Sequence, residues 1–213
     1  WAIKLMKYAA VLITGVVVPC MIFTQGHNDG ETAMQMLSVP VGQRARLILA
    51  DGSSVWVNSG STLKYTSGIR GERRVELSGE ATFNVAHDAS RPFIVTAGNM
   101  RVRVLGTRFN VSAYPRHELS VSLMRGRVSV SSMQNSSDSI ILKPGQRAVL
   151  CDGRYVIKPL YDNPALWTTG LMAFNNAPLT DIINQLETCY GVRIKIGNTR
   201  LQNYTYTGKF RQA

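Results

Sequence analysis

The sequence predicts a mainly β protein with one N-terminal transmembrane helix, an exported all-β domain and a small C-terminal α+β domain. Three observations lead to this prediction. Residues 8–26 form an uncharged apolar run, residues 39–159 alternate polar and apolar residues in short segments, and residues 178–190 repeat with a helical period. The chain has 213 residues, of which 45% are hydrophobic, so it is long enough for one or two globular domains with cores of their own.

The first expected element is a membrane-spanning helix over residues 8–26. A helix of this length measures about 28 Å, close to the roughly 30 Å of a bilayer's hydrocarbon core. The run has no polar face, which favours a membrane span over a buried helix of a globular domain. Its kink-forming proline is tolerated in spanning helices. Residues assigned to the span include Tyr8, Leu12, Val16, Pro19 and Phe23.

The charges on either side of this run predict its orientation. Lys4 and Lys7 precede it, whereas Asp29 and Glu31 follow it. By the positive-inside rule, residues 1–7 form a cytoplasmic stub and the chain after the span is exported. A cleaved signal peptide and a lipoprotein signal ending at Cys20 remain alternatives. Because the chain begins with tryptophan, we expect further sequence upstream.

A linker is expected over residues 27–38 and the β domain over residues 39–160. Short runs of period two recur about every 8–12 residues in that domain, separated by turn dipeptides such as Asp51-Gly52 and Asp152-Gly153. This spacing indicates stacked sheets, as in a sandwich or barrel, or a β-helical sandwich. The predicted strands cover residues 44–49, 54–58, 73–77, 81–85, 93–96, 100–105, 108–112, 119–123, 127–131, 139–142 and 147–150.

The pattern changes in residues 161–213, which we assign to the small α+β domain. A short strand is predicted over residues 171–174 and a helix over residues 178–190, with Gly191 ending the helix. Strands are predicted at residues 192–196 and 204–210. Because the chain stops just after a strand, we expect this domain to be incomplete. The apolar face of the helix contains Leu179, Ile182, Ile183, Leu186 and Tyr190.

Motifs that carry chemistry are missing from the sequence. The three histidines lie on separate segments, and no spacing of histidines and cysteines matches a zinc site. Ser61 and Lys64 fit a Ser-x-x-Lys pattern, but the other motifs of that enzyme class are missing. We therefore predict no catalytic residues, no cofactor, no metal and no enzyme activity. Cys151 and Cys189 are expected to be two buried free thiols, although a bridge between them would be permitted in an exported protein.

The basic residues do not indicate a nucleic-acid partner. The chain has 24 Lys and Arg against 13 Asp and Glu, a net charge of +11. Most arginines stand singly within strands, as is typical of a solvent-facing strand surface. No helix carries a basic stripe and no ribonucleoprotein motif is present. Beyond residue 25 there are 22 basic and 13 acidic groups, so the exported part retains a charge of +9 that would suit an acidic partner.

Motifs across residues 38–211 resemble the FecR domain and the small domain that follows it. The FecR-like motifs are Val39-Pro-x-Gly42, Asp51-Gly52-Ser53-x-Val55-Trp56, Leu77-x-Gly79-Glu80-Ala81-x-Phe83, Val104-Leu105-Gly106-Thr107-x-Phe109-Asn110 and Leu142-x-Pro144-Gly145-Gln146. The small-domain motifs are Trp167-x-x-Gly170-x-x-x-Phe174, Leu186-Glu187-x-x-Tyr190 and Thr207-Gly208-x-Phe210.

This resemblance implies a transmembrane anti-sigma regulator of the inner membrane, with the bulk of the chain in the periplasm. Such proteins sense the signalling domain of a TonB-dependent outer-membrane receptor. They hold an ECF sigma factor through a cytoplasmic domain that we expect to be missing from this chain.

An exposed strand edge in the small domain could accept a partner strand. The candidate residues are Val192, Ile194, Ile196, Tyr204, Tyr206 and Phe210. The alternative function is an exported carbohydrate- or envelope-binding β domain. Such a domain would use exposed aromatic side chains, for which Trp56 and Trp167 are available.

Overall fold

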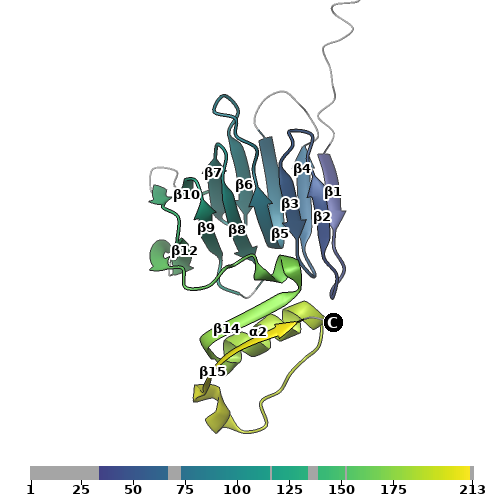
Figure 1. Ribbon diagram of the computed structural model, residues 1–213, viewed down its shortest axis with the longest axis vertical. Helices are drawn as coiled ribbons and strands as arrows, with labels where there is room; N and C mark the ends of the chain where they lie inside the picture. The colour runs from purple at the N-terminus through teal and green to yellow at the C-terminus, as the bar shows by residue number, and fades with distance from the viewer. Residues whose placement is uncertain (1–33, 67–72, 116, 134–138, 152, 212–213) are drawn as a thin grey trace, which may run out of the picture. The chain divides into compact units, whose positions relative to one another are not determined.

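The computed structural model describes residues 34–66, 73–115, 117–133, 139–151 and 153–211 (Figure 1). The predicted span at residues 8–26, including Tyr8, Leu12, Val16, Pro19 and Phe23, lies outside these ranges. No helix within them combines the length and the apolar character needed to cross a bilayer. Residues 34–213 form one compact unit, distinct from residues 1–33. This unit contains both hydrophobic cores described below.

The β domain is a sandwich of two sheets that share one long strand, β5 (Arg73–Asn84). In the first sheet the order is β1 (Met34–Ser38), β4 (Thr62–Thr66), β5, β6 (Phe93–Ala97), β7 (Met100–Val104), β10 (Val128–Ser132) and β11 (Ser139–Leu142). In the second it is β2 (Ala45–Ile48), β3 (Ser54–Val57), β5, β8 (Arg108–Ala113), β9 (Ser120–Arg125), β12 (Gln146–Cys151) and β13 (Arg154–Pro159). The predicted mainly β domain is therefore confirmed as a sandwich.

Strand β5 passes from one sheet to the other at Gly79. This glycine has φ 104°, and a Cβ placed on it would lie 2.2 Å from Ser61 Oγ and 2.7 Å from Ser61 Cα. Only glycine fits both the backbone angle and the close approach. The strand therefore folds back over itself and brings its two ends together. Arg73, at the start of β5, donates a hydrogen bond at 2.9 Å to the carbonyl of Ala86, which lies just past the end of β5.

This fold gives the sandwich two different ends. We call the end formed by turns 49–53, 86–92, 105–107, 125–127 and 143–145 the loop end. The opposite end carries Ser59, Ser61, Gly79, Glu80 and Tyr114, and it contacts the C-terminal residues, so we call it the joint end. The chain passes between the two sheets at both ends, in the turns at residues 105–107 and 125–127 at the loop end and within β5 at Gly79 at the joint end.

The core between the sheets comes from the inward-facing residue of each strand. In the first half of β5, alternate residues are buried and exposed, as a half-buried strand requires. The rings of Phe83 and Phe109 stack at 5.0 Å, and Phe93 meets Phe83 edge-on at 6.1 Å. Burying such side chains is the main favourable contribution to folding.

The β domain begins earlier than the sequence predicts. The sequence predicts a linker over residues 27–38, yet residues 34–38 form β1, which pairs with β4 along its whole length. Leu37 lies opposite Leu63 and packs against the core, so this segment gains both backbone hydrogen bonds and apolar burial.

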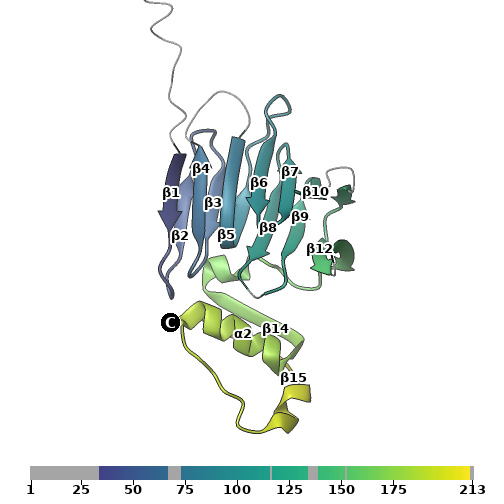
Figure 2. The ribbon, with the colours of Figure 1, turned by 180° about the vertical axis from the view of Figure 1, so that it is seen from behind.

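The C-terminal part forms the small α+β domain. It contains η1 (Leu166–Thr169), β14 (Leu171–Pro178), α2 (Leu179–Tyr190), η2 (Thr199–Asn203) and β15 (Thr205–Arg211). Figure 2 shows α2 lying alongside β14. Strand β15 pairs with β14 in antiparallel register. Its core holds Met172, Phe174, Ile182 and Cys189. The predicted helix is confirmed, and Gly191 ends it with φ 67°.

The prediction of a strand at residues 192–196 is wrong. These residues have no partner strand in the described part of the chain. The carboxylate of Glu187 accepts the backbone N–H of Ile194 at 2.6 Å, so a side chain satisfies the group that a ladder would have used. Strand β15 pairs with β14 instead.

Candidate partner-binding surface

The last strand of the small domain offers an exposed edge and exposed aromatic side chains. Strand β15 pairs with β14 on one side, and no described strand pairs with it on the other. Tyr204 is 57% exposed, Tyr206 47% and Phe210 56%. A free strand edge flanked by aromatic rings suits the addition of an extended partner segment, because backbone hydrogen bonds give affinity and the rings give specificity.

Phe210 lies where the small core ends. It sits opposite Met172 in the β14–β15 pair, and its ring meets that of Phe174 edge-on at 5.9 Å. Met172 and Phe174 are buried in the core beside α2, whereas more than half of the surface of Phe210 remains open. The apolar face that α2 covers therefore continues into an uncovered strip on β15.

The structure separates the two predicted partner-binding segments. Tyr204, Tyr206 and Phe210 lie on or beside a true strand. Val192 is 48% exposed, while Ile194 and Ile196 are half-buried in a segment that is not a strand. Residues 192–196 consequently offer no continuous backbone edge to a partner.

The small domain is attached to the joint end by a few specific contacts. Ser59 Oγ donates to the carbonyls of Thr188 at 2.9 Å and of Cys189 at 3.3 Å, both in the last turn of α2. The buried side chain of Trp167 donates from Nε1 to Asn110 Oδ1 at 3.4 Å, and Arg44 donates to the Trp167 carbonyl. These contacts place the end of α2 and η1 on the β domain.

A buried carboxylate lies beneath this attachment. Asn58 donates to one oxygen of Glu80 at 2.7 Å, and Asn110 donates to the other at 2.9 Å. Burial raises the pKa of Glu80, and the two amide hydrogen bonds and the charge of Arg147 only partly oppose this effect. Tyr114 donates to the Ser59 carbonyl at 2.8 Å, and burial together with the charge of Glu80 raises its pKa well above the usual range.

Sequence reasoning gave no role to Glu80 or Asn110. Both lie on the outer face of the second sheet, where strand alternation predicts solvent exposure. Their burial depends on Trp167, which lies 57 residues after Asn110. One feature of the sequence could have indicated the burial of Glu80 and Asn110. Several polar residues share that face, and a tryptophan later in the chain can cover them; the polar residues are Asn58, Glu80, Thr82 and Asn110.

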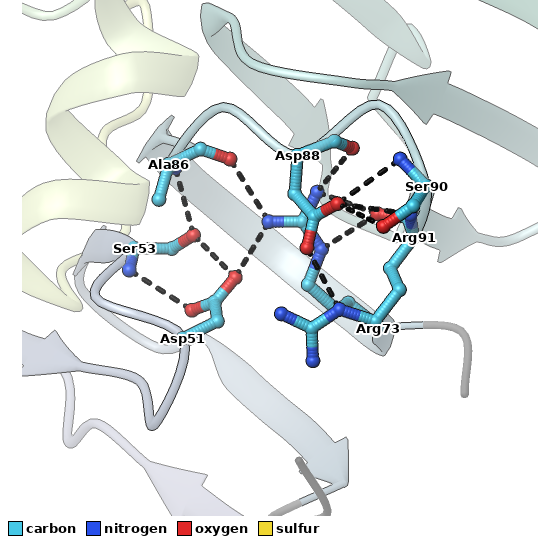
Figure 3. A network of polar contacts seen from close by, with 7 residues as sticks. All are labelled: Asp51, Ser53, Arg73, Ala86, Asp88, Ser90 and Arg91. Atoms are coloured by element: carbon cyan, nitrogen blue, oxygen red, sulfur yellow. Dashed lines mark hydrogen bonds and ion pairs between the residues drawn. The ribbon is translucent and has the colours of Figure 1, made fainter. Parts of the chain in front are cut away.

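A second buried network closes the loop end (Figure 3). Arg73 donates to Asp51 Oδ2 at 2.8 Å and to the carbonyls of Ala86, Asp88 and Arg91. Burial alone would raise the pKa of Asp51, but hydrogen bonds from Ser53 and Arg73 outweigh it and hold that pKa below its usual value. All of these partners are loop or strand-end residues of one domain, so the network is a structural clamp.

The described residues assemble no metal site, since they hold no group of three or more histidine, cysteine or acidic side chains. No disulfide joins Cys151 and Cys189, as expected; Cys189 is buried, but Cys151 is half-buried, so the prediction of two buried thiols is wrong for Cys151. Trp167 is buried and cannot serve as a sugar platform. Trp56 is half-buried, with the guanidinium of Arg46 at 6.0 Å from its ring.

The FecR protein family matches residues 35–142, about half of the chain. The chain belongs to the FecR family. The FecR C-terminal family matches residues 171–213, so the sandwich and the small domain of this FecR protein each correspond to a family.

Two solved structures are similar to this FecR chain over most of their length. Both are crystal structures, at 1.65 and 2.50 Å, of a candidate anti-sigma factor from Parabacteroides distasonis. The 2.50 Å structure is 28% identical with a TM-score of 0.73, and the match covers 85% of this chain and 86% of that one. The 1.65 Å structure has the same identity and TM-score, covering 84% and 85%. No curated protein matches the chain.

Proposed function

We propose that this FecR protein is a single-pass inner-membrane anti-sigma regulator that relays a signal from a TonB-dependent outer-membrane receptor to an ECF sigma factor. The observation that carries this proposal is the occurrence of a FecR domain and a FecR C-terminal domain in one chain. The similarity to candidate anti-sigma factors supports it. In the proposed topology, residues 1–7 are cytoplasmic, residues 8–26 cross the membrane, and the remainder is periplasmic.

The relay works through protein contacts and needs no catalysis. The receptor's signalling domain adds a strand to β15, where Tyr204 and Tyr206 recognise its side chains. Helix α2 packs on the β14–β15 pair, and the carbonyls of its last turn accept hydrogen bonds from Ser59. Binding of a partner strand at β15 therefore acts on a helix that is hydrogen-bonded to the joint end. The sigma factor is held on the cytoplasmic side of the membrane.

The receptor contact is tested with residues 34–213, which form a compact unit with both cores. This fragment is immobilised and exposed to the signalling domains of the organism's TonB-dependent receptors. We expect one of them to bind, and the variant Y204S/Y206S to bind at least tenfold more weakly, because binding hot spots are enriched in tyrosine and each costs about 2 kcal/mol or more when truncated. Phe210 is left unchanged because it packs against Phe174.

The matched control is I141S/V156S, which removes two exposed apolar side chains from the sandwich edges, where Ile141 is 56% and Val156 44% exposed. Binding should survive this change. No retention of any signalling domain at micromolar concentration, or an equal loss in both variants, would contradict the receptor relay. Orientation is measured separately by protease protection of the full chain in sealed membranes, where residues 34–213 should be digested only from the periplasmic side.

A further inference from the structure

Three arginines gather at the loop end. Arg108 begins β8 and lies directly opposite Arg125, the last residue of β9. Arg127 follows two positions after Arg125, and its carbonyl accepts a hydrogen bond from Thr107 Oγ1 at 2.9 Å, which joins the two turns. All three side chains are exposed. Like charges directly opposite one another on neighbouring strands destabilise a sheet, so folding alone does not account for this arrangement.

The acidic groups of the loop end do not neutralise these arginines. Asp51 is paired with Arg73 at 2.8 Å, and Asp88 with Arg91 at 2.7 Å (Figure 3). Among the described residues, no ion pair involves Arg108, Arg125 or Arg127. The loop end therefore presents a concentrated, uncompensated positive charge.

Exposed apolar side chains accompany this charge. Met34 is 63% exposed, Ile48 66% and Leu105 37%. Each lies at the loop end of its strand, since Met34 pairs with Thr66 beside the start of β5, Ile48 pairs with Ser54 across the turn at residues 49–53, and Leu105 follows β7. Cationic groups combined with exposed apolar side chains are typical of surfaces that rest on anionic bilayers.

The position of the N-terminal strand identifies the bilayer as the partner. Strand β1 begins at the loop end with Met34, only eight residues after Gly26, where the predicted span ends. Eight residues reach at most about 29 Å when fully extended. We propose that the loop end lies on the membrane surface and that Arg108, Arg125 and Arg127 bind the phosphates of anionic phospholipids. The inference rests on the membrane anchoring in the proposed function.

The test uses residues 34–213 and sedimentation with vesicles of phosphatidylcholine, with or without about one-third phosphatidylglycerol. We expect binding only to the anionic vesicles, weakening as salt is added. The variant R108Q/R125Q/R127Q should bind roughly 100-fold more weakly, because each basic group near an anionic surface contributes about one kcal/mol. The matched control R154Q/R193Q/R200Q removes the same charge from exposed arginines elsewhere and should bind like the parent fragment.

Folding is checked by thermal unfolding, in which the triple loop-end variant should be as stable as the parent or more stable, since it relieves repulsion. Equal binding to neutral vesicles, or an equal loss in both triple variants, would overturn the proposal. So would failure to bind anionic vesicles combined with loop-end-dependent binding of soluble polyglutamate, which would identify an acidic protein as the partner. This fragment lacks residues 1–33, so its result is independent of the protease-protection test of anchoring.

Discussion

The two ends of the sandwich bury carboxylates in opposite ways. At the loop end, Asp51 faces the guanidinium of Arg73, and its pKa is lowered. At the joint end, Glu80 receives hydrogen bonds from the neutral amides of Asn58 and Asn110, and its pKa is raised. The first carboxylate is stabilised in its charged form by its own domain. The second is buried beside a contact between two domains and is penalised when it is charged.

This difference indicates which end is fixed and which can change. Arg73 connects the turn at residues 49–53 to the turn at residues 86–92 through hydrogen bonds to four different residues. The joint end instead depends on a few separate hydrogen bonds between the two domains, such as the one from Ser59 to the Thr188 carbonyl and the one from Trp167 to Asn110. We expect the loop end to open only on global unfolding and the joint end to open locally.

The largest expected effect is the loss of the loop-end clamp. Arg73→Met should lower the free energy of unfolding by about 3–5 kcal/mol, because it removes a buried guanidinium, leaves the half-buried Asp51 without its ionic partner and leaves the carbonyls of Ala86, Asp88 and Arg91 without this donor. Urea unfolding of residues 34–213 measures this difference. The control is Lys64→Met, which breaks an exposed pair with Glu76 at 3.6 Å and should cost less than about 1 kcal/mol. Similar losses in the two variants would mean that Arg73 is not a clamp.

The next effect concerns the turn of β5 at the joint end. Gly79→Ala should cost about 3 kcal/mol, because it combines a positive φ with a clash against the backbone of Ser61. Gly145→Ala is the matched control, since Gly145 has φ 82° with nothing within 4 Å of the added carbon, and it should cost only about 1–2 kcal/mol. Equal costs would show that the crossing between sheets tolerates a side chain.

Most strands of the sandwich were predictable because their residues alternate, with β1 as an exception, but the burial of polar residues at the joint end was not predictable. Alternation indicates which residues share one side of a strand, and in β5 and β8 the inward side carries Phe83 and Phe109. It cannot report that Glu80 on the opposite face is covered, because that depends on a domain far along the chain. The same period at residues 192–196 predicted a strand, yet Glu187 satisfies Ile194 and β15 takes the place beside β14.

A smaller effect should appear when one hydrogen bond of the joint is removed. Ser59→Ala deletes the donor to the Thr188 and Cys189 carbonyls and should cost about 1 kcal/mol. Amide hydrogen exchange would locate the change. We expect the amides of α2 to exchange faster in the variant than in the parent, and the exchange rates of the core strands of the sandwich to stay the same. Ser129→Ala, at a half-buried position of β10, is the control. Uniformly faster exchange throughout residues 34–213 would contradict local opening.

The smallest expected effect is the response of the joint to pH, because two amides and Arg147 oppose the penalty of burying Glu80. A carboxyl whose pKa is raised on folding binds more protons in the folded state than in the unfolded one. Stability at the joint is therefore gained as the pH falls from neutral toward the usual pKa of 4.5 and is lost as the pH rises through the raised value.

The pKa of Asp51 is lowered on folding, so its effect on stability depends on pH in the opposite direction. The stability that Asp51 contributes is lost only at more acidic pH, as the pH falls through its lowered pKa. Protease cleavage between the two domains should consequently slow between pH 7 and pH 5 in the parent fragment, with the protease activity calibrated at each pH. Glu80→Gln removes the titrating group, so cleavage of that variant should no longer depend on pH over this range. An unchanged pH dependence in Glu80→Gln would show that another group controls the joint, and the two ends would then differ in packing but not in their response to protons.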